Sequence, residues 1–243
     1  MNMNVVEASG LGKRYGGTWA LRECTLAIPD GHVAALVGPN GAGKTTLLNL
    51  AVGLATPSAG RVTVLGGRAP GSLVALDGIA FVAQDAPLYK NLSVADMLHV
   101  TRNLNHRFDQ GYAEARLAEL GIPLNRKAGR LSGGQQAQLA LSLALARRPR
   151  LLVLDEPLAN LDPVARHDFM ATVMAAVAAD GVSVLLSTHV LAELERVADY
   201  LILLSQGQVQ LAGKAGDLLA SHHMVGLEEL ALAYMRETLE VAR

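Results

Sequence analysis

The sequence has no excess of charge of either sign. Its 21 lysines and arginines stand against 22 aspartates and glutamates, which leaves a formal net charge of −1. Proteins that bind DNA or RNA hold the phosphates of the nucleic acid with a basic surface. The balance of acidic and basic residues therefore predicts no nucleic-acid partner. Cys24 is the single cysteine, which excludes an internal disulfide. Because no cationic and apolar signal stretch opens the sequence, we expect a protein of the reducing cytoplasm.

Long apolar runs are missing as well. The longest uncharged stretches, such as residues 131–146, are interrupted by serine, glycine and glutamine. They fall short of the roughly 18 continuous apolar residues of a membrane span, so we expect no span. Internal repeats, low-complexity tracts and blocks of charge are missing from the sequence too. With 51% apolar and 18% charged residues, the chain can bury a full core as one large domain or one domain with two lobes.

Short β-branched runs alternate with amphipathic helical stretches, which predicts an α/β fold with a largely parallel sheet. Apolar runs without polar alternation indicate strands that are buried on both faces, and three such runs occur: Val33–Val37, Leu151–Leu154 and Val182–Leu186. Three further runs, set off by glycine-rich turns, predict a smaller antiparallel sheet: Val5–Leu11, Cys24–Ile28 and Arg61–Leu65.

The middle of the chain changes to helical spacing. Apolar residues recur every three or four positions from Ser93 to Phe108, and Ser93 with Asp96 can cap such a helix. Further helices are predicted at Asp109–Leu120, Ser132–Arg148, Val190–Ala198 and Gly226–Val241. Within a single domain spanning 1–243, we expect residues 86–148 to form a helical lobe inserted between sheet-forming parts at 1–85 and 149–225, with a C-terminal helix at 226–243.

A glycine-rich loop follows the first buried strand. The sequence GPNGAGKTT at Gly38–Thr46 fits G-x-x-x-x-G-K-[ST], and the helical run Leu47–Leu50 comes next. The glycines let successive backbone N–H groups point inward, and the helix N-terminus adds partial positive charge, so the loop is predicted to cradle an anion. Lys44 would reach the β- and γ-phosphates of a nucleotide, and the Thr45 hydroxyl would ligate the Mg²⁺ that neutralises them.

Two carboxylates and a histidine follow the other buried strands. Asp155 and Glu156 come directly after one strand and His189 comes shortly after the next, so all three are expected at the carboxyl edge of the sheet, beside the cradle. Asp155 suits the Mg²⁺ shell, and Glu156 suits a base that polarises the water attacking the γ-phosphate. The imidazole of His189 could donate to the γ-phosphate and hold that water.

The segment LSGGQQ at 131–136 opens the last helix of the predicted lobe. Ser132 is a natural N-cap, and the two glycines after it let a ligand approach the backbone, which predicts a second anion site. The segment belongs to the inserted lobe, so we do not expect it to close over the phosphates of its own chain. A second copy could supply it, which would place two nucleotides between two chains arranged head to tail.

Taken together, these motifs make the sequence strongly similar to the nucleotide-binding subunits of ABC transporters over nearly the whole chain. GPNGAGKTT resembles the Walker A motif, LSGGQQ the family signature, LLVLDEP at 151–157 the Walker B motif, and His189 the switch histidine. The resemblance implies a P-loop NTPase core of the RecA-like type, which carries an N-terminal antiparallel β-subdomain and the inserted helical signature subdomain.

The resemblance also implies the residues of the site. Tyr15 would stack on adenine, and the other ATP contacts would be Gly38, Asn40, Gly41, Gly43, Lys44, Thr45, Thr46, Ser132, Gly133, Gly134 and Gln135. Mg²⁺ would be held by Thr45, Gln84 and Asp155, and catalysis would involve Glu156, His189 and Gln84, which follows a predicted strand at Ile79–Ala83. Ala159 stands in the D-loop at 158–162 where the family more often has serine, which removes a hydroxyl between the two sites.

The implied function is ATP hydrolysis that powers a membrane transporter through closure of two cassettes, at the inner face of the cell membrane. Separate permease subunits would dock near Gln84 and the following Pro87–Ser93, and the second cassette would be the same chain or a homologous partner. The sequence looks most similar to ATPases of bacterial drug, antibiotic and peptide exporters.

Three alternatives remain open at this point. An importer subunit would share every catalytic motif. A soluble ABC ATPase that acts on chromosomes, ribosomes or iron–sulfur assembly would tend to show coiled-coil insertions, two cassettes or a basic surface, none of which the sequence has. A P-loop kinase or GTPase would have no use for LSGGQQ, and the guanine motif N-K-x-D is missing.

Overall fold

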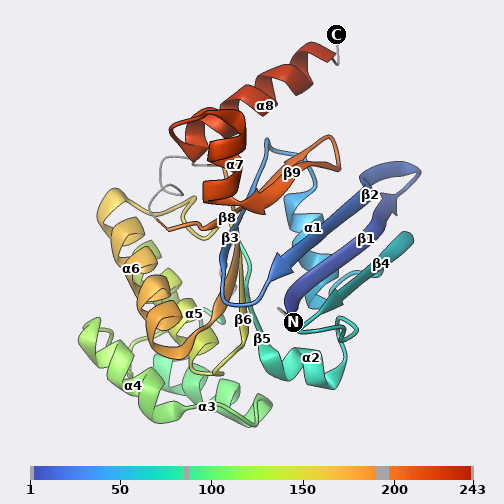
Figure 1. Cartoon of the computed structure of the whole chain (residues 1–243). Coiled ribbons are helices and arrows are strands. Elements are labelled where there is room, and N and C mark those ends of the chain that lie inside the picture. Colours follow the sequence, from blue (N-terminus) through green and yellow to red (C-terminus); the bar gives the residue numbers. More distant parts are fainter. Residues whose placement is uncertain (1–2, 85–87, 190–196, 242–243) are drawn as a thin grey trace.

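The computed structural model describes residues 3–84, 88–189 and 197–241, and beyond residue 235 it describes the backbone alone (Figure 1). Its elements are, in chain order, β1 (Asn4–Tyr15), β2 (Thr18–Pro29), β3 (Val33–Val37), α1 (Lys44–Val52), β4 (Ala59–Val64), α2 (Leu73–Gly78), β5 (Ile79–Val82), α3 (Val94–Leu104), α4 (Gln110–Glu119), the 3₁₀ turn η1 (Ala128–Arg130), α5 (Gly133–Leu145), β6 (Leu151–Asp155), α6 (Pro163–Asp180), β7 (Ser183–Thr188), β8 (Tyr200–Ser205), β9 (Gln208–Lys214), α7 (Ala215–His222) and α8 (Leu227–Val241).

The larger sheet has six strands in the order β5-β6-β7-β3-β8-β9. All neighbouring pairs are parallel except β8 and β9, which form an antiparallel edge. The three strands expected from apolar runs are β6, β7 and β3, which lie side by side, and every residue in them is buried. The predicted α/β class with a largely parallel sheet is therefore confirmed.

The smaller sheet is antiparallel, as predicted, in the order β2-β1-β4. Its first two strands are longer than the apolar runs that marked them, because β1 continues to Tyr15 and β2 begins at Thr18. The hairpin between them turns through Gly16 and Gly17, whose φ angles of 52° and 99° favour glycine. Cys24 is buried in β2, and burial raises the pKa of its thiol.

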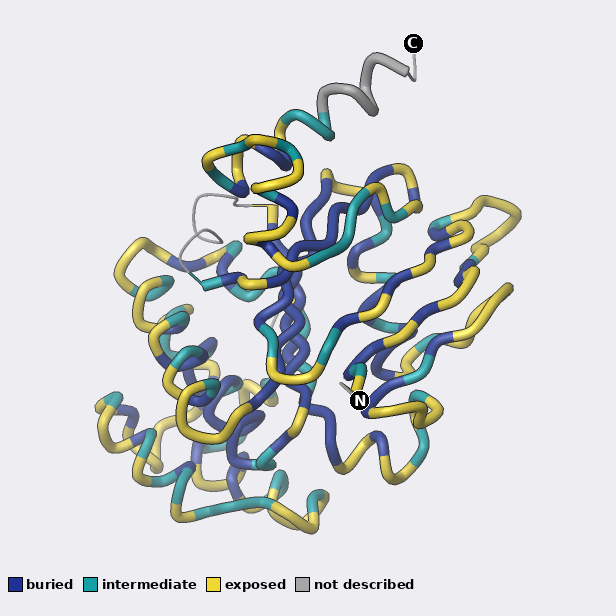
Figure 2. The backbone as a smooth tube through the Cα atoms, viewed as in Figure 1, coloured by how far each residue is buried: buried dark blue, intermediate teal, exposed yellow. Residues whose placement is uncertain are grey.

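Two hydrophobic clusters cover the two faces of the larger sheet. Figure 2 shows that the central strands between them are buried. Leu36 of β3 belongs to the cluster that contains α1 and the smaller sheet. Its neighbours Ala35 and Val37 belong to the cluster that contains α5 and α6. Because successive side chains of a strand point to opposite faces, α1 and α5 lie on opposite faces of the sheet.

Helices α3, α4 and α5 share a third cluster of their own. The predicted cap of the first helix is present, since Ser93 Oγ accepts from the Asp96 N–H while Asp96 Oδ2 accepts from the Ser93 N–H. Two predicted helix ends are wrong. Helix α3 ends at Leu104 rather than near Phe108, because Asn105 is extended. Helix α5 ends at Leu145 rather than Arg148, whose φ of 52° leaves the helical region before β6 begins.

Several elements were not expected from the sequence, namely α2, α6, β8, β9 and α7. Helix α6 nevertheless carries ordinary end signals, since Asp162 caps it, Pro163 opens it and Gly181 closes it in the left-handed conformation. Most of the helix predicted at Val190–Ala198 lies outside the described residues. Within the described ranges, none of the helices has both the length and the apolar character of a membrane span.

Candidate functional site

The glycine-rich loop between β3 and α1 is closely packed on its outer side. A Cβ atom on Gly38 would lie 2.1 Å from the carbonyl oxygen of Leu204, and one on Gly43 would lie 2.6 Å from that of Ala20. Gly43 also has a φ of 104° and precedes the first residue of α1. Only glycine fits these two positions, so the tight curl of the loop and its N–H groups depend on them.

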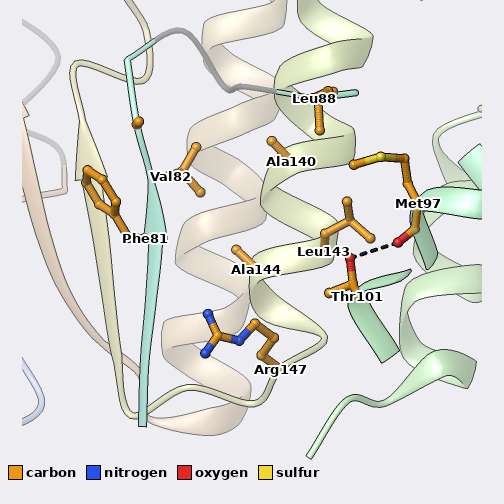
Figure 3. A pocket seen from close by; sticks show the side chains of 10 residues that line it. Phe81, Val82, Leu88, Met97, Thr101, Ala140, Leu143, Ala144 and Arg147 are labelled. Carbon is orange, nitrogen blue, oxygen red and sulfur yellow. Dashed lines mark hydrogen bonds between the residues drawn. The ribbon is translucent and has the colours of Figure 1, made fainter. Parts of the chain in front are cut away.

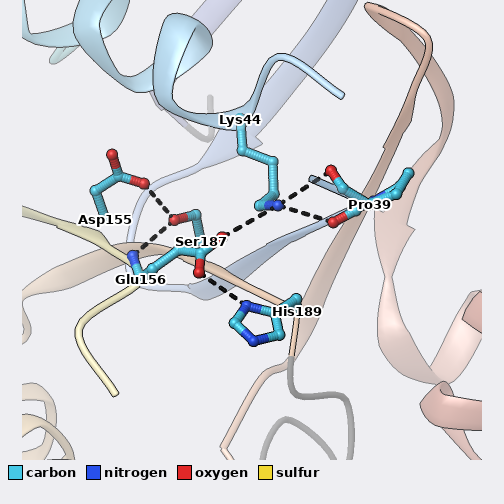
Figure 4. A network of polar contacts seen from close by, with 7 residues as sticks. Pro39, Lys44, Asp155, Glu156, Ser187 and His189 are labelled. Atoms are coloured by element: carbon cyan, nitrogen blue, oxygen red, sulfur yellow. Dashed lines mark hydrogen bonds and ion pairs between the residues drawn. The ribbon is translucent and has the colours of Figure 1, made fainter. Parts of the chain in front are cut away.

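Lys44, the first residue of α1, is 5% exposed and turns back over the loop (Figure 4). Its Nζ donates to the carbonyl oxygens of Gly38 at 2.8 Å and Pro39 at 3.3 Å. The same atom lies 3.2 Å from Oε1 of Glu156. The ammonium group has three N–H donors and three oxygens within reach, which hold its positive charge beside the glycine-rich loop.

Asp155 is the last residue of β6, and Glu156 is the first residue of the turn that follows it. Asp155 is 2% exposed, and its Oδ1 accepts a hydrogen bond of 2.6 Å from the hydroxyl of Ser187 on the neighbouring strand β7. The Ser187 Oγ in turn accepts from the backbone N–H of Glu156 at 2.8 Å. Glu156 has a φ of 44°, an uncommon conformation for a residue other than glycine.

His189 directly follows β7, and its side chain contacts Glu156. Its Nδ1 lies 2.8 Å from Oε2 of Glu156, while the other oxygen of that carboxylate meets Lys44. The histidine side chain is 48% exposed and the glutamate side chain 11%. The structure thus brings together Lys44, Asp155, Glu156 and His189, which the sequence placed at one sheet edge, and adds Ser187, to which the sequence reasoning gave no role.

The other residues expected around the phosphates lie along the loop and the start of α1. Asn40, Gly41 and Thr45 are exposed, and Thr46 is half-buried. Tyr15 lies at the tip of the β1–β2 hairpin with 51% of its surface exposed, and the Lys13 ammonium is 5.0 Å from its ring centroid. An exposed aromatic ring at this hairpin tip is available to a flat ligand.

The LSGGQQ segment forms the N-terminus of α5. Ser132 and Gln135 make a capping box, in which the Ser132 Oγ accepts from the Gln135 N–H and the Gln135 Oε1 accepts from the Ser132 N–H, both at 3.2 Å. Ser132 and Gly133 are exposed and Gly134 is half-buried. A Cβ on Gly134 would lie 3.0 Å from the Cβ of Ala165 in α6, so the backbone packs closely there.

Gln84 lies near this segment rather than in the Lys44 network. A pocket of about 180 Å³ is lined by Gln84, Gly133 and Asn160, among others. Among the described residues, no hydrogen bond or ion pair joins Gln84 or Ser132 to Lys44 or Glu156. The chain therefore presents two groups of site residues at the carboxyl edge of the sheet, one with α1 and one with α5, and the sheet separates the two helices.

A second pocket, of about 210 Å³, opens between β5 and the helices α3 and α5 (Figure 3). Apolar side chains line most of it, including Phe81, Leu88 and Met97. Arg147 closes one end and donates a hydrogen bond of 2.7 Å to the carbonyl oxygen of Leu76 in α2. We refer to this pocket as the β5–α3 groove.

Comparison with known proteins gives a consistent result. A family model described as ABC transporter matches residues 21–159. The chain is 34% identical to the Nod factor export ATP-binding protein I of Rhizobium johnstonii, over 86% of this chain and 69% of that protein. It is 37% identical to the Fe(3+) ions import ATP-binding protein FbpC of Pseudomonas fluorescens, over 87% of this chain and 62% of that protein. The chain thus spans about two thirds of the length of these relatives.

The solved structures agree with the sequence relatives. The fold is similar, with a TM-score of 0.75 and 25% identity, to a dimeric ATP-binding cassette captured in a post-hydrolysis state with ADP and Pi. That likeness covers 86% of this chain and 98% of the other.

Proposed function

Because the chain belongs to the ABC transporter family of ATP-binding, ATP-hydrolysing proteins, we propose that it powers a membrane transporter through the closure of two cassettes on two ATP molecules. The other cassette is a second copy of this chain or a homologous partner. The observation that supports this best is the separation of α1 and α5 by the sheet. The LSGGQQ segment and the glycine-rich loop face the same edge but lie on opposite faces, so each suits a nucleotide shared with a neighbour.

In this proposal the glycine-rich loop binds the phosphates of ATP. Backbone N–H groups of the loop and the N-terminus of α1 surround the phosphates, with contacts from Gly38, Asn40, Gly41, Gly43, Thr45 and Thr46. The Lys44 ammonium group exchanges its ion pair with Glu156 for contacts with the β- and γ-phosphates, and Tyr15 stacks on the base. From the partner copy, the Ser132–Gln135 cap faces the γ-phosphate.

The residues present fit a Mg²⁺ ion that arrives with the nucleotide. Magnesium prefers oxygen ligands and is commonly held by one or two protein groups together with substrate phosphates. The exposed Thr45 hydroxyl and the Asp155 carboxylate at the end of β6 are such oxygens. The Gln84 amide lies with the α5 group in this structure, so it would have to approach them when the two cassettes close. When bound, the ion would neutralise the charge that develops on the phosphates.

Glu156 is proposed as the base for the attacking water. Its carboxylate lies between Lys44 and His189, so it stands where the γ-phosphate would enter. His189 then donates to the γ-phosphate and keeps the water aligned. Charge repulsion after hydrolysis and the loss of γ-phosphate contacts would let the two copies part, which is the movement that a transporter uses.

The β5–α3 groove and its rim are the proposed docking site for the permease. The groove lies beside Leu88, and the next residue, Tyr89, is 67% exposed. Pro87, also expected at this surface, lies outside the described residues. In this proposal the lobe at 86–148 responds to the permease, the core at 1–85 and 149–225 binds ATP, and the chain lies at the inner face of the membrane.

We propose export as the direction, on the resemblance to exporter ATPases that includes the C-terminal helix α8. An importer relative matches over a similar share of the chain, so the direction needs its own test. Cells that lack the chain should become sensitive to a panel of antibiotics and antimicrobial peptides. Normal resistance together with poor growth on one limiting nutrient would indicate an importer instead. Purification of the chain from membranes without any integral subunit would favour a soluble ABC ATPase.

A mixing experiment tests the shared nucleotide site. Lys44→Ala disables the loop of one copy, and Ser132→Arg disables the cap of another, so neither variant should hydrolyse ATP alone. A mixed dimer contains one site in which both the loop and the cap are intact. ATP hydrolysis by the mixture, and none by either variant, is the expected result. If the mixture stays inactive while mixed dimers form, the two copies do not share their sites.

A further inference from the structure

Ser187 is a fully buried residue of β7 that lies beside the two acidic residues of the site. The register of the parallel strands pairs it directly with Asp155 on β6. Its hydroxyl donates to Asp155 Oδ1 at 2.6 Å and accepts from the backbone N–H of Glu156 at 2.8 Å. One hydroxyl therefore contacts both residues whose carboxylates face the phosphates.

We propose that Ser187 is a positioning residue for ATP hydrolysis, which orients the Asp155 carboxylate and the Glu156 backbone relative to each other. This inference rests on the roles proposed above for Asp155 and Glu156. Ser187 itself has no exposed surface, so it acts through those two residues rather than on the nucleotide.

The contact with Asp155 fixes one oxygen of a buried carboxylate. The last torsion of an aspartate side chain has a broad, two-fold energy profile, so the carboxylate turns easily unless a neighbour holds it. A hydroxyl that donates to an ionised carboxylate makes a short and strong hydrogen bond, which agrees with the observed 2.6 Å. With Oδ1 held by Ser187, the orientation of Oδ2 is set as well.

The contact with Glu156 stabilises a strained backbone turn directly after β6. A glutamate with a φ of 44° occupies a sparsely populated region, and such a conformation persists only where the surroundings stabilise it. The Ser187 Oγ accepts the N–H of this residue at the strand end. This turn directs the carboxylate toward Lys44 at 3.2 Å and His189 at 2.8 Å.

The same strand provides a matched control. Ser183 begins β7, is also fully buried, and makes the same pair of contacts at the opposite edge of the sheet. Its Oγ donates to Asp30 Oδ1 at 2.7 Å and accepts from the Gly31 N–H at 2.8 Å. Replacing Ser183 removes an equivalent buried hydroxyl far from the nucleotide, so it reports the structural cost alone.

The experiment compares Ser187→Ala, Ser187→Thr and Ser183→Ala in the purified full chain. Leaving a buried donor and a buried acceptor unpaired is expected to lower kcat about tenfold in Ser187→Ala. At saturating Mg²⁺ the KM for ATP should change little, because the loop is intact. Ser187→Thr keeps a hydroxyl and should restore most of the turnover. Ser183→Ala should lower the melting temperature by a similar amount as Ser187→Ala and leave kcat unchanged.

A binding measurement provides a readout that does not depend on turnover. In the Glu156→Gln background, which should bind ATP without hydrolysing it, Mg²⁺ is titrated and binding of a fluorescent ATP analogue is followed. Adding Ser187→Ala should raise the Mg²⁺ concentration at half-maximal binding, because the Asp155 carboxylate is no longer held. Adding Ser183→Ala should leave that concentration unchanged.

The outcomes separate this inference from the proposed function. Wild-type kcat in Ser187→Ala, or an equal loss of kcat in Ser183→Ala, would overturn the role of Ser187. If Ser187→Ala leaves the Mg²⁺ dependence of binding unchanged, Ser187 does not act through its contact with Asp155. If Glu156→Gln itself kept wild-type turnover, the proposed role of Glu156 would fail, whatever the serine variants did.

Discussion

The Nδ1 atom of His189 lies 2.8 Å from Oε2 of Glu156, while Oε1 of the same carboxylate lies 3.2 Å from Nζ of Lys44. One acidic side chain therefore bridges Lys44, the first residue of α1, and His189, the residue directly after β7. Lys44 has a better partner in a phosphate, which carries more negative charge than a carboxylate. Binding of ATP is thus expected to take Lys44 from Glu156 and to leave Glu156 with His189 at the γ-phosphate.

Glu156→Gln should bind ATP and slow its hydrolysis by at least about a hundredfold, the scale of losing a general base. The amide keeps the size of the side chain but cannot accept a proton, so the closed dimer should accumulate. Phosphate release and size-exclusion chromatography with ATP measure the two effects. The exposed Glu23→Gln is the control and should behave as wild type. Unchanged turnover in Glu156→Gln would remove this residue from its role.

His189→Ala should lower kcat by about a hundredfold, the scale of losing one donor to a developing charge. Binding of ATP should change little, because the loop and Lys44 remain. Steady-state kinetics at saturating ATP measure this change. His167→Ala, at an exposed position of α6, is the control. Equal activities of the two variants would show that the contact with Glu156 has no part in hydrolysis.

Lys44→Ala should abolish measurable ATP binding. The variant loses the only side chain in the described site that brings a permanent positive charge into the loop, and an anion then depends on backbone N–H groups alone. Isothermal titration calorimetry with ATP measures the loss. Lys127→Ala removes an exposed lysine from the helical lobe and should bind ATP normally. Retained affinity in Lys44→Ala would contradict the proposed phosphate contact.

The sequence predicted the sheet edge well, because its signals are local. The run Val33–Val37 is apolar throughout and became a strand with the same ends. Polar residues directly after such strands must lie at one edge of a parallel sheet, which placed Asp155, Glu156 and His189 together. Helix α6 also has local signals, since Pro163 favours a helix start and Gly181 a helix end.

The contacts within the edge could not be predicted from local signals. The bond between Ser187 and Asp155 depends on β6 and β7 being neighbours in one register, with a whole helix between them in the chain. The contact between Glu156 and His189 depends on the left-handed backbone at Glu156, which its residue type does not favour. The approach of Gln84 to Gly133 depends on how α5 packs against β5.

Asp109→Asn should lower the thermal stability of the chain at neutral pH, with a difference that vanishes in acid. Asp109 caps α4, and the Tyr112 N–H and the Arg148 guanidinium hold the pKa of its carboxyl below the ordinary value of 3.8. A carboxyl whose pKa is lower in the folded than in the unfolded chain stabilises the fold at pH values above its ordinary pKa. This contribution to stability is lost as the pH falls through the pKa of the folded state. Melting curves of both proteins from neutral pH to below 3.8 measure this. A constant difference would contradict it.

Tyr89→Glu should uncouple transport and leave the basal hydrolysis of the isolated chain unchanged. Tyr89 is 67% exposed and directly follows Leu88, which lines the β5–α3 groove. A charge at this position would have to be desolvated on docking of an apolar permease segment. Co-purification with the integral subunit and transport in intact cells should both fall. Val225→Glu, at a position 93% exposed between α7 and α8, is the control. Normal transport by Tyr89→Glu would exclude this part of the rim as the docking surface, whereas loss in both variants would indicate a general effect of surface charge.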